Sequence, residues 1–158
     1  SLDEINQIMN INLISALNIS NTIIPKMILN KIGRIINISF ILGLNPLKFV
    51  GAYSMSKAAL IQMTKSQSIE LAKYNILVNA ICPGYVLTPL VEAQIPATME
   101  KYNMGRDEVI KKVMLERQPS REFATVEQLG GTCVFLSSPA ADQITGTTIS
   151  VDGGWTAL

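Results

Sequence analysis

The chain of 158 residues contains no histidine, only two cysteines, and few charged residues, which make up 16% of it. The absence of histidine excludes Ser-His-Asp and Cys-His catalysis and zinc sites built on imidazole. Cys82 and Cys133 lie far apart and fit no metal or disulfide spacing, so we expect two packed, reduced thiols and no metal site. Any acid–base chemistry must therefore use Tyr, Lys, Asp, Glu or Cys.

Charge and hydropathy exclude further classes. The net charge is +1, and lysines and arginines are scattered, which argues against a nucleic-acid surface. Apolar segments are interrupted well before 18 residues, so no membrane span is expected. Ser1 leads directly into a helical pattern without signal-peptide features, which favours a cytoplasmic location. With 48% hydrophobic residues, the chain reads as one globular domain over 1–158.

Hydrophobic periodicity predicts alternating helices and strands. The helix at 3–30 contains Pro25, which should kink it or mark a break near its end. A second helix is expected at 52–73, with Ala58, Ala59, Met63 and Ile69 buried, and a capping box at Thr125 opens a third that runs to 135. Residues 88–118 look helical but irregular. Short apolar runs predict buried strands at 33–39, 76–82 and 146–154.

This alternation predicts an α/β fold with a parallel sheet of about three strands and crossover helices. Such a sheet is thin, and its first strand would expose a long hydrophobic edge unless another strand lies beside it. The sequence therefore looks like part of a larger fold.

Tyr53 and Lys57 are the strongest candidates for chemistry. At i and i+4 of a helix they share one face. A free phenol titrates near pH 10, and an ammonium within about 4–6 Å favours the phenolate. Such a tyrosine can exchange a proton with a carbonyl or alcohol oxygen near neutral pH. The spacing alone is a weak signal, because it occurs by chance in many helices, and it is also compatible with a packed tyrosine and a solvated lysine.

The context of the pair favours the functional reading. It follows one buried strand, and the segment ICPGYVLTP follows the next, so both leave the carboxyl ends of parallel strands, where α/β sheets bind ligands. Pro83 and Gly84 allow close backbone approach, and Thr88 offers a hydroxyl to a phosphate or amide.

Five segments carry a family resemblance in this order: INL at 11–13, GRIINIS, YSMSKAAL, VNAICPGYVLTP and GTTISVDGG. Together they resemble the C-terminal part of a short-chain dehydrogenase/reductase, and ERQPSREFATVEQLGGTCVFLSS more narrowly resembles the bacterial D-3-hydroxybutyrate dehydrogenases. The resemblance implies a partial Rossmann-like, doubly wound sheet and hydride transfer between NAD, with NADP not excluded, and 3-hydroxybutyrate or acetoacetate.

The resemblance also implies roles for individual residues. Tyr53 would be the general acid/base, Lys57 would hold the nicotinamide ribose, and Asn12 would anchor a proton-relay water. Gln94 matches a position that contacts the substrate carboxylate. The residues expected to border the nicotinamide are Pro83, Gly84, Val86 and Thr88.

The sequence departs from the family pattern in two places. The opening T-G-x-x-x-G-x-G turn and the N-N-A-G segment do not occur, so we interpret 1–158 as one truncated domain without the dinucleotide half. The family's catalytic serine lies 13 residues before the tyrosine, where this chain has Phe40. Ser39 is one residue early, and in an extended strand that shift turns a side chain to the opposite face, although a loop adjustment would let it substitute.

The residues expected to bind the substrate also differ from the family pattern. The histidine and lysine that hydroxybutyrate enzymes carry are replaced by Leu42 and Val50, although Lys48 offers a partial replacement with a rearranged loop. Three hypotheses follow: a catalytically silent relative of a hydroxybutyrate dehydrogenase, the catalytic half of a split enzyme completed by an N-terminal half, or a module that forms homo-oligomers through the helices at 3–30 and 52–73.

Overall fold

The computed structural model describes residues 1–157 and opens with one long helical segment. It consists of α1 (Leu2–Met9), a π-helical turn (Asn10–Ile14) and α2 (Ser15–Asn30). Ser1 and Glu4 form a capping box at its start. The expected helix at 3–30 is confirmed, and α2 continues past Pro25 to Asn30, which excludes a break there and leaves a kink as the remaining alternative. Lys31, with φ of 53°, ends the helix.

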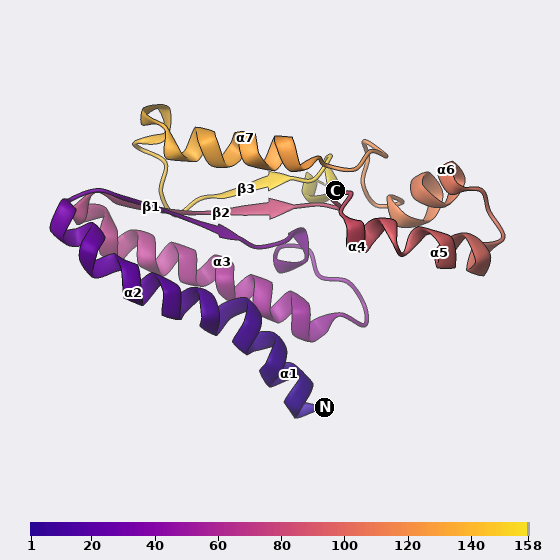
Figure 1. Ribbon diagram of the computed structural model, residues 1–158, viewed down its shortest axis with the longest axis horizontal. Helices are drawn as coiled ribbons and strands as arrows, with labels where there is room; N and C mark the ends of the chain where they lie inside the picture. The colour runs from indigo at the N-terminus through magenta and orange to yellow at the C-terminus, as the bar shows by residue number, and fades with distance from the viewer. Residues whose placement is uncertain (158) are drawn as a thin grey trace.

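Three parallel strands form the sheet in the order β1-β2-β3: β1 (Gly33–Ile38), β2 (Ile76–Pro83) and β3 (Thr148–Val151). β2 is central and buried along its whole length, whereas β1 and β3 each have one open edge among residues 1–157. Figure 1 shows α2 and α3 (Gly51–Leu71) on one face and α7 (Val126–Ser137) on the other. The predicted α/β, doubly wound arrangement is confirmed.

The C-terminal strand is shorter than the predicted range of 146–154. Gly153 and Gly154 adopt φ values of 57° and 92°, which turn the chain away from the sheet after Val151. The capping box at Thr125 and Gln128 is present and begins α7, as predicted, although the helix runs two residues further than expected, to Ser137.

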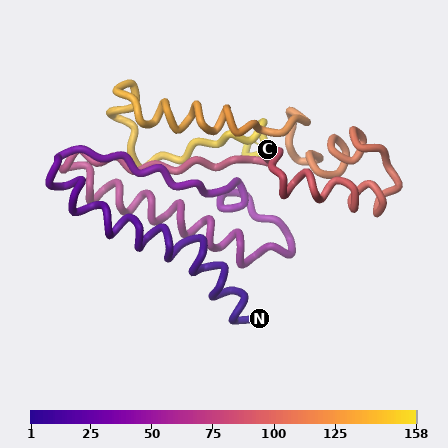
Figure 2. Tube along the Cα trace, in the orientation of Figure 1, coloured from indigo at the N-terminus to yellow at the C-terminus, as the bar shows by residue number. Residues whose placement is uncertain are grey.

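The segment between β2 and α7 extends away from the sheet as a helical excursion (Figures 1 and 2). It contains α4 (Pro89–Glu92), α5 (Ile95–Tyr102), α6 (Arg106–Val109) and a second π-helical turn (Ile110–Met114). Short 3-10 turns complete the fold at Ile41–Gly43, Ala72–Tyr74, Pro139–Ala141 and Trp155–Ala157. Within 1–157, no helix combines the length and apolar character needed to cross a bilayer.

Helix α3 buries a different face from the one expected. Ala58 is exposed, Ala59 and Met63 are half-buried, and Ile69 is 81% exposed. The buried face is partly polar, and three of its hydroxyls, those of Ser56, Thr64 and Ser68, bond to carbonyls of the same helix; Thr64 donates to the Leu60 carbonyl at 2.9 Å. The buried positions are Ser54, Ser56, Leu60, Ile61, Thr64, Gln67, Ser68 and Leu71.

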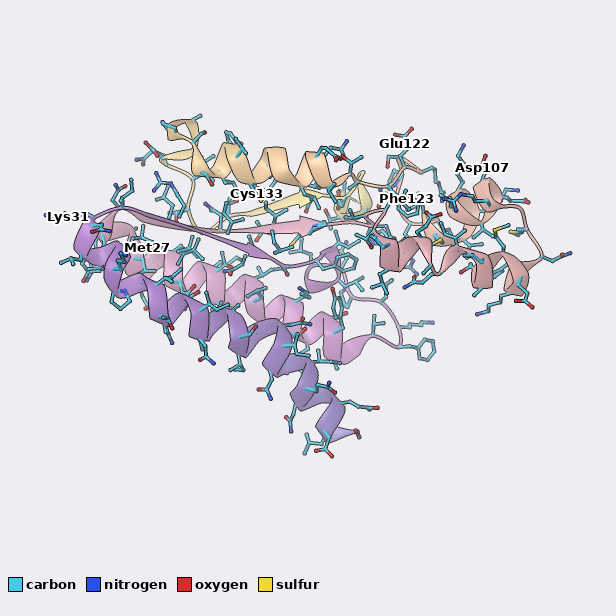
Figure 3. The ribbon with its side chains drawn as sticks, viewed as in Figure 1. Met27, Lys31, Asp107, Glu122, Phe123 and Cys133 are labelled. Atoms are coloured by element: carbon cyan, nitrogen blue, oxygen red, sulfur yellow. The ribbon has the colours of Figure 1, made fainter. Side chains whose placement is uncertain are left out.

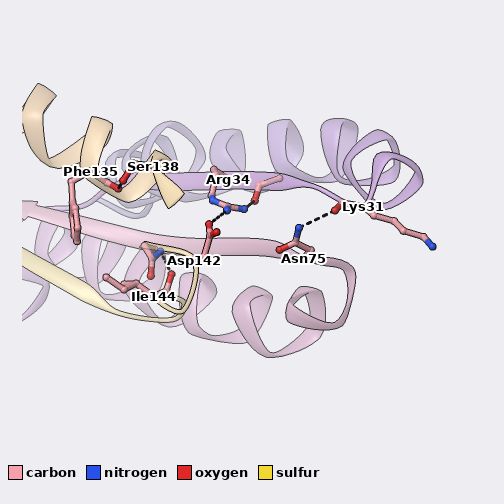
Figure 4. Close-up of polar contacts among 9 residues, drawn as sticks. Lys31, Arg34, Asn75, Phe135, Ser138, Asp142 and Ile144 are labelled. Carbon is pink, nitrogen blue, oxygen red and sulfur yellow. Dashed lines mark hydrogen bonds and ion pairs between the residues drawn. The ribbon is translucent and has the colours of Figure 1, made fainter. Parts of the chain in front are cut away.

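Close packing fixes the turn from α2 into β1. A Cβ on Gly33 would lie 2.6 Å from Sδ of Met27, so a larger residue there would require the Met27 side chain to move. Figure 3 shows Met27 and Lys31 at this end of α2. Asn75 Nδ2 donates to the Lys31 carbonyl at 3.1 Å, and Arg34 pairs with Asp142 at 2.5 Å, tying β1 to the loop after α7 (Figure 4).

Three apolar clusters form the core. The first joins β1 and β2 to α2 and α3 and is built on Ile35, Leu71, Ile76 and Val78. The second joins the sheet to α7 and is built on Ile81, Leu136 and Ala141. The third lies beyond the carboxyl ends of the strands, where the candidate site is, and is built on Ile41, Leu42 and Trp155.

Candidate active site

The carboxyl ends of β1 and β2 hold Tyr53 and Lys57. Both side chains come from the first two turns of α3, which begins at Gly51. Lys57 Nζ lies 5.7 Å from the centroid of the Tyr53 ring and donates to the carbonyl of Ile38, the last residue of β1, at 3.1 Å. The ammonium is thus held between the end of the strand and the phenol, and it retains two further N–H donors.

Burial dominates the electrostatics of this pair. It raises the pKa of the Tyr53 phenol above 10.0 and lowers the pKa of the Lys57 ammonium below 10.5, while the charge of Cys82 opposes the second shift. The net pKa of Tyr53 is therefore raised and not lowered as expected, because desolvation of the phenol is the dominant effect.

Lys57→Met should remove a pH dependence of stability. Because the pKa of Lys57 is lower in the folded than in the unfolded chain, the buried ammonium opposes folding at neutral pH, and stability rises as the pH approaches 10.5 from below. The free energy of unfolding in urea, measured between pH 7 and 9.5, should rise more steeply for the wild type than for Lys57→Met. The exposed Lys65→Met is the control and should follow the wild type; parallel curves for all three proteins would contradict the assignment.

Ser39 and Phe40 occupy opposite sides of the chain where β1 ends. The Ser39 side chain is 3% exposed, and its hydroxyl donates to the Lys57 carbonyl at 2.9 Å, so it faces α3. Phe40 faces the tyrosine instead: its ring packs edge-on against Tyr53, with centroids 5.8 Å apart and planes at 70°. A phenyl ring therefore stands beside Tyr53, and the Ser39 hydroxyl is already used inside the fold.

Apolar and aromatic side chains surround the rest of Tyr53. Phe40, Leu47, Tyr53 and Tyr85 pack against the buried cluster formed by Ile41, Leu42 and Trp155. Leu42 is 7% exposed, and the Tyr85 and Trp155 rings lie 5.9 Å apart. Trp155 was missing from the candidates because it reaches the site from the far end of the chain; an aromatic residue directly after the paired glycines was the available signal.

Asn12 reaches the site through a residue that the sequence analysis passed over. Its Nδ2 donates to the Ser56 hydroxyl at 3.0 Å, and Ser56 donates to the Tyr53 carbonyl at 2.7 Å. Asn12 sits in the π-helical turn of the first helix, a distortion frequent at functional sites. Ser56 lies inside the YSMSK segment, which was the signal for its position.

The remaining predicted residues line the chain leaving β2. Pro83 and Gly84 are buried at the end of the strand, and Val86 forms an isolated parallel bridge with Ala124. Thr88 caps α4 by accepting a bond from the Val91 N–H at 3.3 Å. Gln94 is exposed just before α5, and its described hydrogen bonds involve its backbone N–H and carbonyl, not its side-chain amide.

Gly84→Ala should destabilise the chain by about 1–3 kcal/mol through overpacking. Its Cβ would lie 2.7 Å from Gln118 Oε1 and 2.9 Å from the backbone Cα of Asp152. Gly130→Ala is the matched control, since a Cβ there meets nothing within 4 Å and lies inside α7, where alanine should stabilise by about 1 kcal/mol. Equal urea midpoints for the two variants would contradict the packing.

Comparison with known proteins places this arrangement in a family. A family profile described as Enoyl-(Acyl carrier protein) reductase matches residues 1–156. The D-beta-hydroxybutyrate dehydrogenase of Rhizobium meliloti is 42% identical over 99% of this chain and 60% of its own length. The D-beta-hydroxybutyrate dehydrogenase of Cupriavidus necator is 40% identical over 93% of this chain and 57% of its own length.

Solved structures of dehydrogenases also match the fold of this chain. A short chain dehydrogenase family protein from Francisella tularensis superposes with a TM-score of 0.86 at 28% identity, over 100% of this chain and 64% of its own. A putative NAD(P) dependent gluconate 5-dehydrogenase from Beutenbergia cavernae, with bound NADP, gives 0.87 at 32% identity, over 100% and 59%. A 4-hydroxyisoleucine dehydrogenase complexed with NADH has a TM-score of 0.87 at 31% identity, over 100% of this chain and 61% of its own.

The chain therefore belongs to the short-chain dehydrogenase/reductase family, whose members bind NAD(P). Within that family its sequence is similar to the D-beta-hydroxybutyrate dehydrogenases of Rhizobium meliloti and Cupriavidus necator. It spans about 60% of the length of these relatives.

Proposed function

We propose that this chain is the substrate-facing part of a 3-hydroxybutyrate dehydrogenase-like enzyme whose catalytic step is impaired. The observation that carries the proposal is Phe40, whose ring packs on Tyr53 at 5.8 Å where the family places a serine hydroxyl. Ser39 is engaged with the Lys57 carbonyl and is 3% exposed, so its hydroxyl would have to leave the fold to reach a substrate.

The positions of Tyr53, Lys57 and Asn12 support a proton-transfer role for this part of the chain. The Tyr53 phenol would exchange a proton with the substrate oxygen, and Lys57, held at the Ile38 carbonyl, would stabilise the phenolate. Asn12 and Ser56 would orient the first turn of α3 and lead toward a relay water. Without a hydroxyl donor at position 40, the developing oxyanion loses a hydrogen bond that is typically worth about 10²–10³ in turnover.

The residues present fit the nicotinamide end of a dinucleotide. Lys57 keeps two N–H donors for ribose hydroxyls, and β2 ends in a buried Pro83-Gly84 pair that leads directly into Tyr85. When bound, NAD or NADP would supply or accept the hydride. Val86 and Thr88 would border its amide, and which of the two dinucleotides binds is part of the proposal's test.

The substrate end has lost polar groups. Leu42 is buried among apolar side chains, and Val50 stands where the family carries a lysine. Gln94, exposed before α5, would be the remaining family contact for a carboxylate. We therefore expect 3-hydroxybutyrate and acetoacetate to bind weakly and to react slowly.

The test uses the purified chain of 158 residues. Titration with NADH and with NADPH, followed by nicotinamide fluorescence, measures cofactor binding, and oxidation of 3-hydroxybutyrate measures turnover. Impaired function predicts no turnover above background. Saturable NADH binding together with oxidation at a rate typical of dehydrogenases would overturn the proposal.

Two alternatives have their own support. A complementary N-terminal half on a second polypeptide would pair with the open edge of β1, and mixing the two halves would then generate activity.

A homo-oligomer through α1, α2 and α3 would cover exposed apolar side chains on this helical surface, including Ile11 and Ile19 at 63% and Ile69 at 81% exposed. Light scattering on the chain, with Ile69→Lys as the disrupting variant, tests this alternative. A cytoplasmic location remains part of the same proposal.

A further inference from the structure

A small hollow opens beside the aromatic cluster of the candidate site. Its volume is about 140 Å³, and its lining residues are Asn45, Pro46, Arg117 and Trp155. By the share of liquid volume that one water takes, it has room for roughly four to five waters, and so for the carboxylate end of a small acid. It joins the loop after β1, the end of the helical excursion and the C-terminal turn, which Figure 1 shows near the carboxyl ends of the strands.

Arg117 is the cation of this hollow, and its charge is uncommitted. Of the four arginines, Arg34 pairs with Asp142, Arg106 with Glu92, and Arg121 donates to the carbonyls of Lys111 and Leu115. Among residues 1–157, Arg117 has no ion pair and no side-chain hydrogen bond. Its backbone is nonetheless fixed, because it lies between Leu115 and Gln118, which are 0% and 1% exposed.

The surroundings favour an anion over other ligands. No carboxylate lines the hollow, and Asn45 adds an amide that can donate a second hydrogen bond. Trp155, which is 6% exposed, forms one wall of the hollow, and Arg117 is exposed to solvent beside it. A charge-assisted bond from its guanidinium to an anion is stronger than a bond between neutral groups. A planar fork of N–H donors matches the two oxygens of a carboxylate.

Trp155 connects the hollow to the reaction centre. The same indole belongs to the buried cluster against which Phe40, Leu47 and Tyr53 pack. The polar groups expected on the substrate side are absent at Leu42 and Val50. Arg117, which lines the same hollow as Trp155, adds a cation near this cluster besides Lys57.

We infer that Arg117, assisted by Asn45, binds the carboxylate of a small hydroxy or keto acid. The inference deepens the proposed function and rests on it for the substrate class. Recognition and chemistry would then be separate in this chain: the acid is held, while the proton-transfer step beside Phe40 is impaired.

Trp155 provides the readout, since it is the single tryptophan of the chain. Its fluorescence is followed while the 158-residue chain is titrated with D-3-hydroxybutyrate, and separately with the uncharged methyl ester. The acid should give a saturable change and the ester none. Arg117→Gln should weaken the apparent affinity for the acid about tenfold or more, and Arg117→Lys should retain part of it.

Lys65→Gln is the control, because Lys65 is an exposed lysine of α3 that does not line the hollow. It should bind the acid as the wild type does. No saturable change, equal responses to acid and ester, or loss of binding in Lys65→Gln but not in Arg117→Gln would each overturn the inference. The readout needs neither cofactor nor turnover, so its failure is distinguishable from failure of the proposed function.

Discussion

Phe40→Ser should raise turnover by about 100-fold or more once residues 1–158 are joined to a dinucleotide-binding half. The chimera carries the N-terminal portion of the Rhizobium meliloti D-beta-hydroxybutyrate dehydrogenase ahead of Ser1. The reason for the gain is local: the substitution removes a ring 5.8 Å from that of Tyr53 and puts a hydroxyl on the same side of the chain. The measurement is kcat for oxidation of 3-hydroxybutyrate, followed as NADH formation.

Substitutions at position 40 and at positions 42 and 50 should affect different kinetic constants. A hydroxyl that bonds the developing oxyanion acts in the transition state, so Phe40→Ser should change kcat far more than KM. Adding Leu42→His and Val50→Lys restores groups that bind the carboxylate, and these should act mainly by lowering KM. If Phe40→Ser changed KM alone, the ring would be blocking substrate entry and the assignment of position 40 would be wrong.

The control for this experiment is a second phenylalanine. Phe49 is completely exposed and lies on the same loop region, so Phe49→Ser should leave kcat within about twofold of the parent chimera. Tyr53→Phe on the Phe40→Ser background should return turnover to background, because the restored hydroxyl has no proton to transfer without the phenol.

Asn79→Ala should destabilise the chain by about 2–4 kcal/mol, the largest stability effect that we expect of a single polar side chain. Asn79 is 1% exposed in the middle of β2. Its Nδ2 donates to the Ile144 carbonyl at 2.7 Å, and its Oδ1 accepts from the Thr147 N–H at 3.1 Å. One amide thus satisfies two backbone groups of the loop that leads into β3, and truncation leaves both without a partner.

Urea unfolding followed by circular dichroism measures this effect. A loss of that size is a large fraction of the total stability of a typical domain, about 5–15 kcal/mol. Asn21→Ala provides the comparison, because Asn21 is an exposed residue of α2 and should gain a few tenths of a kcal/mol in helix propensity. A loss below about 1 kcal/mol for Asn79→Ala would mean that water replaces the amide in the loop.

Local patterns predicted most of the fold. The capping box at Thr125, the apolar run of β2 and the first helix all involve contacts within a few residues, and each was found near its predicted place. The misjudged face of α3 shows where such reasoning stops. Burial of Thr64 depends on a hydroxyl bonding its own helix and on the sheet that covers it, whereas the exposure of Ile69 depends on what surrounds the molecule.

In the candidate site, too, features set by local periodicity could be predicted, and features that depend on distant segments could not. The Tyr53–Lys57 spacing and the shift of Ser39 by one residue could be read from the sequence, because helix and strand periodicities fix the direction of each side chain. The approach of Trp155 and Arg117 could not, since both come from segments more than 60 residues away in the sequence. The pKa of Tyr53 was also beyond reach, because its direction depends on how deeply the ring is buried.

The two open edges of the sheet have a consequence for how molecules of this chain meet in solution. Unpaired backbone groups on β1 and β3 are templates for a further strand. The sequence pI is about 7.7 with a net charge of +1, so two molecules near neutral pH scarcely repel each other. Colloidal stability is therefore lowest close to physiological pH, and acidic conditions that still preserve the fold give these edges their strongest mutual repulsion.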